Sequence, residues 1–550
     1  MPMESITRRG FTAALAGAPA MLRAQSSRPN ILLIITDDQG YGDLSLHGND
    51  KLQTPNIDSI GRGGVQFSQF HVNPVCSPTR ASLMTGRHYY RTGVVDTFLG
   101  RSMMHSGEVT VAECLRDAGY RTGLFGKWHL GDNYPLRSID QGFQESLNCT
   151  GGGLTQPSDP PGNTYFDPML RHNGKWEKHK GYCTDIFFQS ATQFIEANRG
   201  RPFFVYLPTN APHDPLQIDE SYAAPFRKAG LDDRTAKVYG MVKNVDDNVG
   251  RLLARLKQLR LEENTIVIFL TDNGPQHDRY NAGMRGRKAT VYEGGIRVPF
   301  LMRWPRGLKR AATVSDFAAH IDVMPTLLEA CGVPAPSQVN IDGRSLMPLL
   351  NGKAKALPAR TVFFQWHRGD VPNPHQNAAA SDGRFKLVNG KELYDLTADP
   401  GEKNDIAASQ PEIARKLRGE YDRWFADVTA TRNFAPPRIY LGTEHEDPVT
   451  LTRQDWRGPK AAWSPQANGY WEVDVRKAGR YDITFRLLNP VSGEARFRLG
   501  AAHVTQPAAE AGEIVMKNVE LPAGPARLEA EIARESTATG VNYVDVRRNA

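Results

Sequence analysis

The sequence predicts an α/β protein with a mostly parallel sheet, and two patterns in the first half of the chain indicate it. Short apolar runs at residues 31–35, 203–207 and 265–270 each lead into polar residues, as buried central strands do. Between them, residues 109–118 and 238–259 carry apolar side chains at the three- and four-residue spacing of helices. Strands that alternate with helices favour a sheet flanked by helices, which binds ligands at the carboxyl ends of its strands.

A change of pattern late in the chain predicts two further units. The α/β pattern covers residues 28–355, and shorter strands with one amphipathic helix near residues 411–425 predict a small α+β subdomain over residues 356–430. A proline-containing linker follows near residues 434–439. Period-two strands separated by Gly and Pro turns then predict an appended β-sandwich over residues 446–550.

The amino terminus differs from the rest of the chain. Thr7-Arg8-Arg9-Gly10-Phe11 precedes a weakly apolar stretch and small residues near Ala24, which predicts a twin-arginine (Tat) signal peptide over residues 1–25. The alternative is a disordered basic terminus that happens to contain two arginines. No other stretch reaches about 18 apolar residues, so we expect a periplasmic or secreted protein without a transmembrane segment.

Charge and cysteine usage exclude several classes of function. The formal net charge of +7 is modest for 550 residues and comes without a long Lys/Arg stripe, so no nucleic-acid partner is expected. The five cysteines are widely spaced and form no CxxC pair, which argues against a zinc site and against a dense disulfide framework. One bridge, between Cys149 and Cys183, is left open.

The most informative segment surrounds Cys76. Ser77 can cap a helix and Pro78 suits its first turn, so Cys76 is predicted at a helix amino terminus. Backbone N–H groups and the helix dipole favour an anion such as sulfate or phosphate there. The alternative is a buried cysteine in front of an ordinary helix.

The run Cys76-Ser77-Pro78-Thr79-Arg80 resembles the C-x-P-x-R signature of the type I, formylglycine-dependent sulfatase family of the alkaline phosphatase-like superfamily. The resemblance covers about residues 28–425. It implies an alkaline phosphatase-like fold and a sulfuric ester hydrolase that releases inorganic sulfate from a sulfated carbohydrate or an aryl sulfate. It also implies that a formylglycine-generating enzyme oxidises Cys76 to an aldehyde, whose hydrate attacks the sulfur.

Two further pairs match the metal-binding positions of that family. Asp37 and Asp38 follow the first predicted strand, and Asp272 and Asn273 follow the strand at residues 265–270. Four oxygen-bearing side chains suit one Ca²⁺ ion rather than zinc, with Cys76 as a fifth member of the implied metal site. Taken singly, either pair is more typical of a turn at a strand end.

The remaining site residues come from three motifs that resemble those of the family. Gly126-Lys127-Trp128-His129 implies a lysine on the sulfate and a histidine on the formylglycine, and alternation puts both side chains on one face of an extended segment. His213 is the implied acid for the leaving oxygen, Lys288 the second sulfate-binding lysine, and Arg80 a holder of the aldehyde hydrate. The catalytic set is thus Cys76, Arg80, Lys127, His129, His213 and Lys288.

Two other functions remain open, together with the role of the β-sandwich. Phosphonate monoester and phosphodiester hydrolases resemble sulfatases and share the nucleophile, and a non-catalytic binder of sulfated glycans would use the same fold. Loops at residues 147–185 and 366–381 are expected to complete the pocket. The sandwich resembles galactose-binding-like carbohydrate modules weakly, in its pattern of strands and turns. It either tethers the enzyme to a polymer or only packs against the core. Nothing in the sequence places it at the active site.

Overall fold

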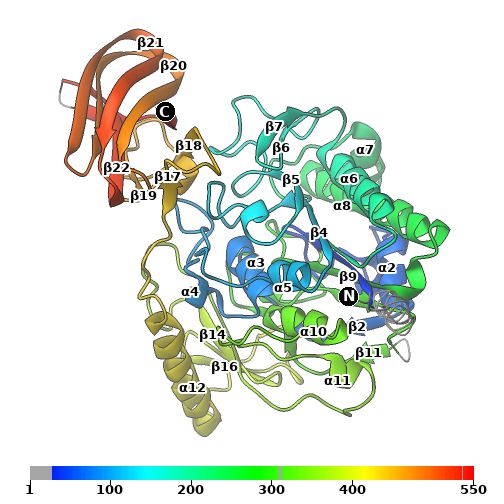
Figure 1. The fold of residues 1–550 in the computed structure, drawn as a ribbon. Helices are drawn as coiled ribbons and strands as arrows, with labels where there is room; N and C mark the ends of the chain where they lie inside the picture. The colour runs from blue at the N-terminus through cyan, green and yellow to red at the C-terminus, as the bar shows by residue number, and fades with distance from the viewer. Residues whose placement is uncertain (1–27, 309–311, 536, 550) are drawn as a thin grey trace, which may run out of the picture.

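A ten-stranded mixed sheet forms the centre of the molecule (Figure 1). The computed structural model describes residues 28–308, 312–535 and 537–549, so the predicted signal peptide lies outside the described residues. The sheet has the order β11-β2-β10-β9-β1-β8-β4-β5-β6-β7. Its strands are β1 (Asn30–Thr36), β2 (Val65–Phe67), β4 (Arg121–Lys127), β5 (Glu145–Cys149), β6 (Met169–His172), β7 (Lys175–Lys178), β8 (Phe203–Pro208), β9 (Thr265–Thr271), β10 (Phe300–Arg303) and β11 (Ala312–Val314).

The three strands predicted from apolar runs are β1, β8 and β9, and they lie side by side. β1 pairs in parallel with both β8 and β9, and β4 pairs in parallel with β8. Antiparallel pairing enters at β10, β6 and β7. All seven residues of β1 are buried, because its side chains alternate between two hydrophobic clusters on opposite faces of the sheet. The α/β prediction is therefore confirmed.

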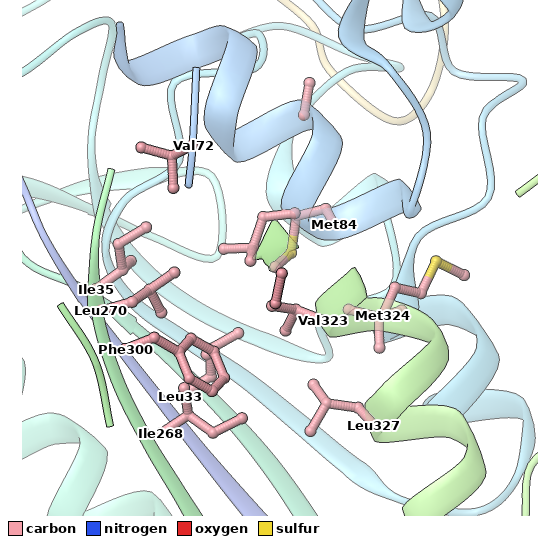
Figure 2. Packing of buried hydrophobic residues seen from close by; sticks show 14 of the residues in the cluster. Leu33, Ile35, Val72, Met84, Ile268, Leu270, Phe300, Val323, Met324 and Leu327 are labelled. Carbon is pink, nitrogen blue, oxygen red and sulfur yellow. The ribbon is translucent and has the colours of Figure 1, made fainter. Parts of the chain in front are cut away.

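Helices cover both faces of this sheet (Figure 1). On one face, Leu33, Ile268 and Phe300 of the sheet pack near Met84 of α3 and Leu327 of α10, as Figure 2 shows. On the other face, α2, α6 and α8 supply the apolar partners. The helices are α2 (Pro55–Arg62), α3 (Cys76–Thr85), α4 (Tyr89–Thr92), α5 (Val111–Asp117), α6 (Cys183–Ala197), α7 (Glu220–Lys228), α8 (Asp233–Gln258), α9 (Glu293–Ile296), α10 (Val323–Ala330) and α11 (Met347–Leu350).

Helix boundaries follow their capping residues. α5 begins after Thr110, which forms a capping box with Glu113. α8 starts earlier than its apolar periodicity predicted, because the Asp232 side chain accepts hydrogen bonds from the backbone N–H groups of Arg234 and Thr235. Its polar first turn carries no apolar signal.

The smaller α+β unit contains a four-stranded antiparallel sheet covered by one long helix. Its elements are β13 (Val362–Gln365), β14 (Ala378–Ser381), β15 (Phe385–Val388), β16 (Glu392–Asp395) and α12 (Pro411–Ala430). A buried group of charges joins it to the main unit. Lys386 Nζ lies 2.9 Å from Glu293 Oε1 and 2.7 Å from Glu402 Oε1, and His71 Nε2 lies 3.0 Å from Glu293 Oε2. We call His71, Glu293, Lys386 and Glu402 the supporting ion cluster.

The carboxy-terminal strands are confirmed, but they begin earlier and run longer than predicted. They are β17 (Ile439–Leu441), β18 (Val449–Thr452), β19 (Tyr470–Val475), β20 (Gly479–Leu499), β21 (Ala502–Leu521), β22 (Gly524–Arg534), β23 (Thr537–Gly540) and β24 (Tyr543–Arg548). β17 pairs with β19, so this β-domain takes in the end of the predicted linker. β20 pairs with β24 through its first half and with β22 through its second, and register shifts let it bend between them around one hydrophobic cluster.

The β-domain is docked on the main unit through apolar and polar contacts. Leu99, Met103 and Leu136 of the main unit belong to the hydrophobic cluster of the β-domain. The backbone N–H of Gly100 donates to Gln454 O at 2.9 Å. Because these contacts are buried, removal of the β-domain would expose apolar surface of the main unit.

Two expectations about the whole chain can be compared with the structure. The described residues include all five cysteines, and none of them forms a disulfide, so Cys149 and Cys183, whose pairing the sequence left open, are free thiols in this structure. Both thiols are buried on separate elements, β5 and α6. Across the part of the chain that the structure describes, every helix is too short or too polar to cross a membrane.

Candidate active site

Four neighbouring strands deliver polar side chains to one edge of the sheet. Asp37 and Asp38 follow β1, Asp272 and Asn273 follow β9, and Lys127 ends β4. His213 lies beyond the end of β8. Because β9, β1, β8 and β4 are adjacent and parallel, their carboxyl ends meet, as the sequence predicted.

Cys76 occupies the first turn of α3. The helix begins at Cys76 itself, with Val75 as its N-cap, so the prediction that Ser77 caps the helix is wrong. The Ser77 hydroxyl is buried and has no hydrogen-bond partner among the described residues. Pro78 does lie in the first turn, where the missing N–H costs nothing. The backbone N–H groups of Cys76 and Ser77, at the start of the helix, therefore have no intrahelical acceptor.

Three carboxylates and three cations are packed together beneath Cys76. Lys127 Nζ lies 2.5 Å from Asp37 Oδ2, and Lys288 Nζ lies 2.7 Å from Asp38 Oδ1. The guanidinium of Arg80 donates to Asp272 Oδ2 at 2.8 and 3.0 Å. We call these the active-site ion cluster, which contains Asp37, Asp38, Arg80, Lys127, Asp272 and Lys288.

Two oxygen atoms, one in this cluster and one beside it, are left for a metal ion. Asp37 Oδ1 and Asn273 Oδ1 are buried and have no hydrogen-bond partner among the described residues. Ligand atoms of Asp37, Cys76 and Asp272 lie within 4.8 Å of one another, as do those of Asp37, Asp38 and His213. An oxygen-rich donor set of this kind fits Ca²⁺. The three cations already balance the charge of the three carboxylates, so the ion is not needed to neutralise them.

Two glycines allow the cationic residues to reach the site. Gly126 has φ +137°, and a Cβ there would lie 1.9 Å from Pro208 O, so only glycine lets β4 pass β8 just before Lys127. A Cβ on Gly274 would lie 2.0 Å from Gly294 O. That close approach holds the loop that carries Lys288, whose backbone N–H donates to Pro275 O at 3.1 Å.

His129 reaches the site by a different route from the one predicted. β4 ends at Lys127 and His129 has φ +61°, so strand alternation does not apply to this pair. The His129 Nε2–H donates to Thr97 O at 2.7 Å. Burial and the nearby Lys127 charge lower the pKa of His129 well below its usual value, so its Nδ1, which has no partner among the described residues, is a hydrogen-bond acceptor.

His213 lines the same cavity as His129 and lies close to Asp38. Its Nδ1–H donates to Asp214 O at 2.6 Å, and its Nε2 lies 3.7 Å from Asp38 Oδ2. Burial lowers the pKa of His213, while Asp37 and Asp38 oppose that effect. The Nε2 atom is therefore the one that can exchange a proton with a ligand.

Burial also controls the protonation of the acidic groups. It raises the pKa of the Cys76 thiol to about 11, although Lys127 and Lys288 act in the opposite direction. Burial and the Asp37 carboxylate raise the pKa of Asp272 to about 7, against the effect of Arg80. Burial raises the pKa of Asp37 too, but Lys127 and the other cations outweigh it, and the pKa ends well below its usual value.

A cavity of about 650 Å³ opens above Cys76. His129, His213 and Lys288 line it, whereas Arg80 and Lys127 lie beneath it with no exposed surface. The two loops expected from sequence contribute Gly152, Gln156, Trp366 and Arg368. Sequence reasoning missed the lining residues Thr97, Phe98, Gln276 and Trp463. They carry no local motif, and Trp463 comes from the β-domain.

Comparison with known families identifies the chain. The model of the sulfatase family matches residues 29–333, and the model described as N-sulphoglucosamine sulphohydrolase, C-terminal, matches residues 286–423. The chain belongs to the sulfatase family. It is therefore a sulfuric ester hydrolase by family, and the earlier resemblance is confirmed.

Related sulfatases cover most of the chain. Arylsulfatase A of Homo sapiens is 31% identical, with 80% of this chain and 95% of that protein aligned. Steryl-sulfatase of Homo sapiens is 28% identical, with 72% and 88% aligned. The crystal structure of Ps i-CgsB has 30% sequence identity and a TM-score of 0.66, covering 72% of this chain and 92% of that one. These sulfatases have the alkaline phosphatase-like fold found here.

Proposed function

We propose that the chain hydrolyses a sulfate monoester of a carbohydrate or a phenol, and that formylglycine at position 76 is its nucleophile. The observation that supports this most strongly is the position of Cys76. It lies at a helix amino terminus, at the bottom of a cavity, and above three cations. That arrangement favours a tetrahedral anion directly beside residue 76.

The modification explains how a cysteine could serve in sulfate hydrolysis. A thiol would form a stable thiosulfate-type intermediate that needs an external water for release. A hydrated aldehyde has two hydroxyl groups, so one can attack the sulfur and the second can expel the sulfate. A formylglycine-generating enzyme is the proposed partner for this maturation.

Each site residue has a role that its contacts support. Lys127 and Lys288 neutralise the sulfate oxygens by exchanging a carboxylate partner for the substrate. His213 Nε2, once protonated, donates its proton to the leaving oxygen. His129 Nδ1 accepts a proton from residue 76 as sulfate is released. Arg80 fixes Asp272 and also donates to Lys127 O at 3.0 Å, so we assign it a positioning role.

Calcium is the metal that the free oxygen atoms fit. Asp37, Asp38, Asp272 and Asn273 would hold it, together with residue 76. When bound, the ion supplies positive charge for the sulfate and the attacking oxygen.

Replacement of Cys76 tests the proposal. Cys76→Ala should abolish sulfate release from para-nitrophenyl sulfate while circular dichroism and the melting temperature stay unchanged. Cys331→Ala is the matched control, because Cys331 is equally buried but lies outside the site, and it should keep full turnover. Turnover by Cys76→Ala at the wild-type rate would exclude residue 76 as the nucleophile.

The same assay distinguishes a sulfatase from the alternative, a phosphonate monoester hydrolase. A phosphonate monoester hydrolase from Silicibacter pomeroyi shares the fold, at 21% identity and a TM-score of 0.55. A sulfatase should prefer para-nitrophenyl sulfate over the matched phenyl phosphonate in kcat/KM, and the reverse order would favour the alternative. The structure of Ps i-CgsB in complex with k-i-k-neocarrahexaose, at 29% identity, supports a carbohydrate ester as substrate.

We also propose export through the twin-arginine signal at residues 1–25. Because this route carries folded proteins, oxidation of Cys76 would precede export. Fully modified protein in the cytoplasm of a Tat-blocked host is the expected result, and unmodified protein there would contradict this order of events.

A further inference from the structure

The outer wall of the active-site cavity is a row of stacked side chains from three distant segments. The Arg368 guanidinium carbon lies 4.4 Å from the Phe98 ring centroid and 4.9 Å from that of Trp366. The rings of Phe98 and Trp463 meet edge to face, with centroids 5.4 Å apart. We call Phe98, Trp366, Arg368 and Trp463 the aromatic wall.

Trp463 brings the β-domain into this wall. It lies in the segment between η5 (Arg453–Asp455) and β19, and that segment is fixed in place. The Arg453 guanidinium donates to Ser464 O at 2.7 Å, and also to Gly540 O and Val541 O. Trp463 nevertheless keeps 38% of its surface exposed and lines the cavity. A segment held by these hydrogen bonds therefore presents a large apolar side chain to the cavity.

The charge of the lining is one-sided. Among the described residues that line the cavity, Arg287, Lys288 and Arg368 are cationic and none is acidic. The Lys288 ammonium faces the reaction centre, whereas Arg368 belongs to the outer wall and its side chain is half exposed. Asp96, behind the wall, lies 3.3 Å from Arg368. Arg287 likewise lies 3.6 Å from Asp278, which is outside the lining. The outer cavity therefore presents two partly exposed guanidinium groups, Arg287 and Arg368, that can bind an anion other than the sulfate at the reaction centre.

The other lining side chains are polar. Thr97, Gln156, Gln276 and Thr290 face the same cavity as the aromatic wall. A sterol in this cavity would leave their hydrogen-bonding groups unpaired, which is costly when water is excluded. A sugar has apolar C–H faces that fit an aromatic ring and hydroxyl groups that fit amide and hydroxyl side chains.

From these observations we propose that the β-domain completes the subsite for the leaving group. Trp463 packs against a sugar ring, and Arg368 pairs with a second anionic group on the same saccharide. The substrate class is therefore a saccharide that carries another sulfate or a carboxylate besides the ester that is cleaved. The inference rests on the proposed sulfatase function and adds a specificity-determining residue from outside the matched family domains, which end at residue 423.

Binding to an inactive chain tests the proposal without relying on turnover. The Cys76→Ala chain is titrated by calorimetry with sulfated disaccharides from carrageenan, chondroitin and heparin, carrying one sulfate, two sulfates, or one sulfate and one uronate. Adding Trp463→Ala should weaken the tightest complex by about tenfold, the upper range for one aromatic contact. Trp176→Ala is the control, since Trp176 has the same 38% exposure but lies in another cavity, and it should change nothing.

Arg368→Gln separates the role of charge from that of stacking. It should remove the preference for saccharides with two anionic groups, and Arg368→Lys should restore part of it. Comparison of the disulfated and the uronate ligands shows which anion is recognised. Equal affinity for one and two anionic groups in the parent chain would overturn this part of the proposal.

The outcomes also separate failure of this inference from failure of the sulfatase proposal. Equal losses in Trp463→Ala and Trp176→Ala would overturn the role of Trp463. If the wild type hydrolyses para-nitrophenyl sulfate but no disaccharide binds, the saccharide class is wrong and the sulfatase function stands. If wild-type enzyme neither releases sulfate from any of these esters nor binds them, both proposals fail. Unchanged melting temperatures confirm that each variant is folded.

Discussion

Two buried ion clusters in this enzyme resemble each other in burial and in charge, yet only one lies at the proposed reaction centre beside Cys76. In the supporting ion cluster, Lys386 bridges Glu293 and Glu402, and Arg297 adds a second cation 3.7 Å from Glu293. Burial raises the pKa of Glu293, but Lys386 and His71 outweigh it and the pKa falls well below its usual value. A lowered carboxyl pKa therefore occurs in both clusters.

Free ligand atoms and access to a cavity make the difference. In the active-site ion cluster Asp37 Oδ1, and beside it Asn273 Oδ1, have no partner among the described residues, and the cluster lies beneath the cavity above Cys76. The supporting ion cluster lies between α9 and the four-stranded sheet, where it joins two units. A shifted pKa alone thus indicates only that a charged group is buried. Oxygen atoms that lack partners and lie beneath a cavity are what indicate the candidate active site.

Removal of calcium should distinguish the two ion clusters most clearly, because only the active-site ion cluster is proposed to bind the ion. Exhaustive chelation is expected to abolish sulfate release, and added Ca²⁺ should restore it. The chain should stay folded, because the three carboxylates are already paired with three cations. Calcium at about a hundred times its Kd should add about 2.7 kcal/mol to the free energy of unfolding, seen as a higher melting temperature. Full activity after chelation would exclude the metal site.

Lys386→Met should have the largest effect on stability. It leaves two buried carboxylates without their shared cation, so the free energy of unfolding should fall by about 3–5 kcal/mol. Lys391→Met, at an exposed position just after the same strand, should have little effect. Denaturant unfolding measures both. A loss no larger than that of the control would show that the supporting ion cluster does not hold the two units together.

Lys288→Ala should act on the reaction instead. Loss of one cation that faces the sulfate should lower kcat/KM by about a hundred- to a thousandfold, the effect of one stabilising donor in other enzymes. Lys257→Ala, on the exposed side of α8, is the control. A drop in melting temperature without a drop in kcat/KM would place Lys288 among the structural charges.

The smallest effect on stability is expected from Asp159, a buried carboxyl group outside both ion clusters. Among the described residues, Asp159 accepts hydrogen bonds from Thr150, Thr155 and Asn163 alone, and burial raises its pKa to about 7. Its folded pKa exceeds the unfolded one, so its contribution to stability is complete below about pH 4 and is lost as the pH rises through 7.

The resulting prediction compares two pH values. The free energy of unfolding should fall by about 1 kcal/mol between pH 6 and pH 8 through Asp159. Asp159→Asn keeps the N–H donors of Thr155 and Asn163 paired with its Oδ1, while its NH2 group can donate to the Thr150 hydroxyl, and it should flatten that part of the profile. An identical slope in the variant would show that Asp159 is ionised in the folded enzyme.

Local patterns predicted the central sheet and the site because both depend on residues close together in sequence. β1 has an apolar run that is buried on both faces, and its polar residues follow at once, so strand and ligands come from one segment. The features that the sequence did not predict are those determined by tertiary contacts. The N-cap of α3 is Val75, two residues before Ser77, and Cys149 and Cys183, whose pairing the sequence left open, lie on separate elements. Trp463 lies at the cavity because the β-domain docks on the main unit. The sequence around Trp463 contains no motif that predicts this docking.

The chemical state of residue 76 in active enzyme tests the central claim most directly. Trypsin should release residues 63–80 as one peptide, in which Cys76 is the only cysteine. Mass spectrometry should find the aldehyde in place of the CH₂SH group, in proportion to specific activity, and the peptide should react with a hydrazide probe. A fully active preparation in which this peptide carries only an intact thiol, alkylated by iodoacetamide, would contradict the account.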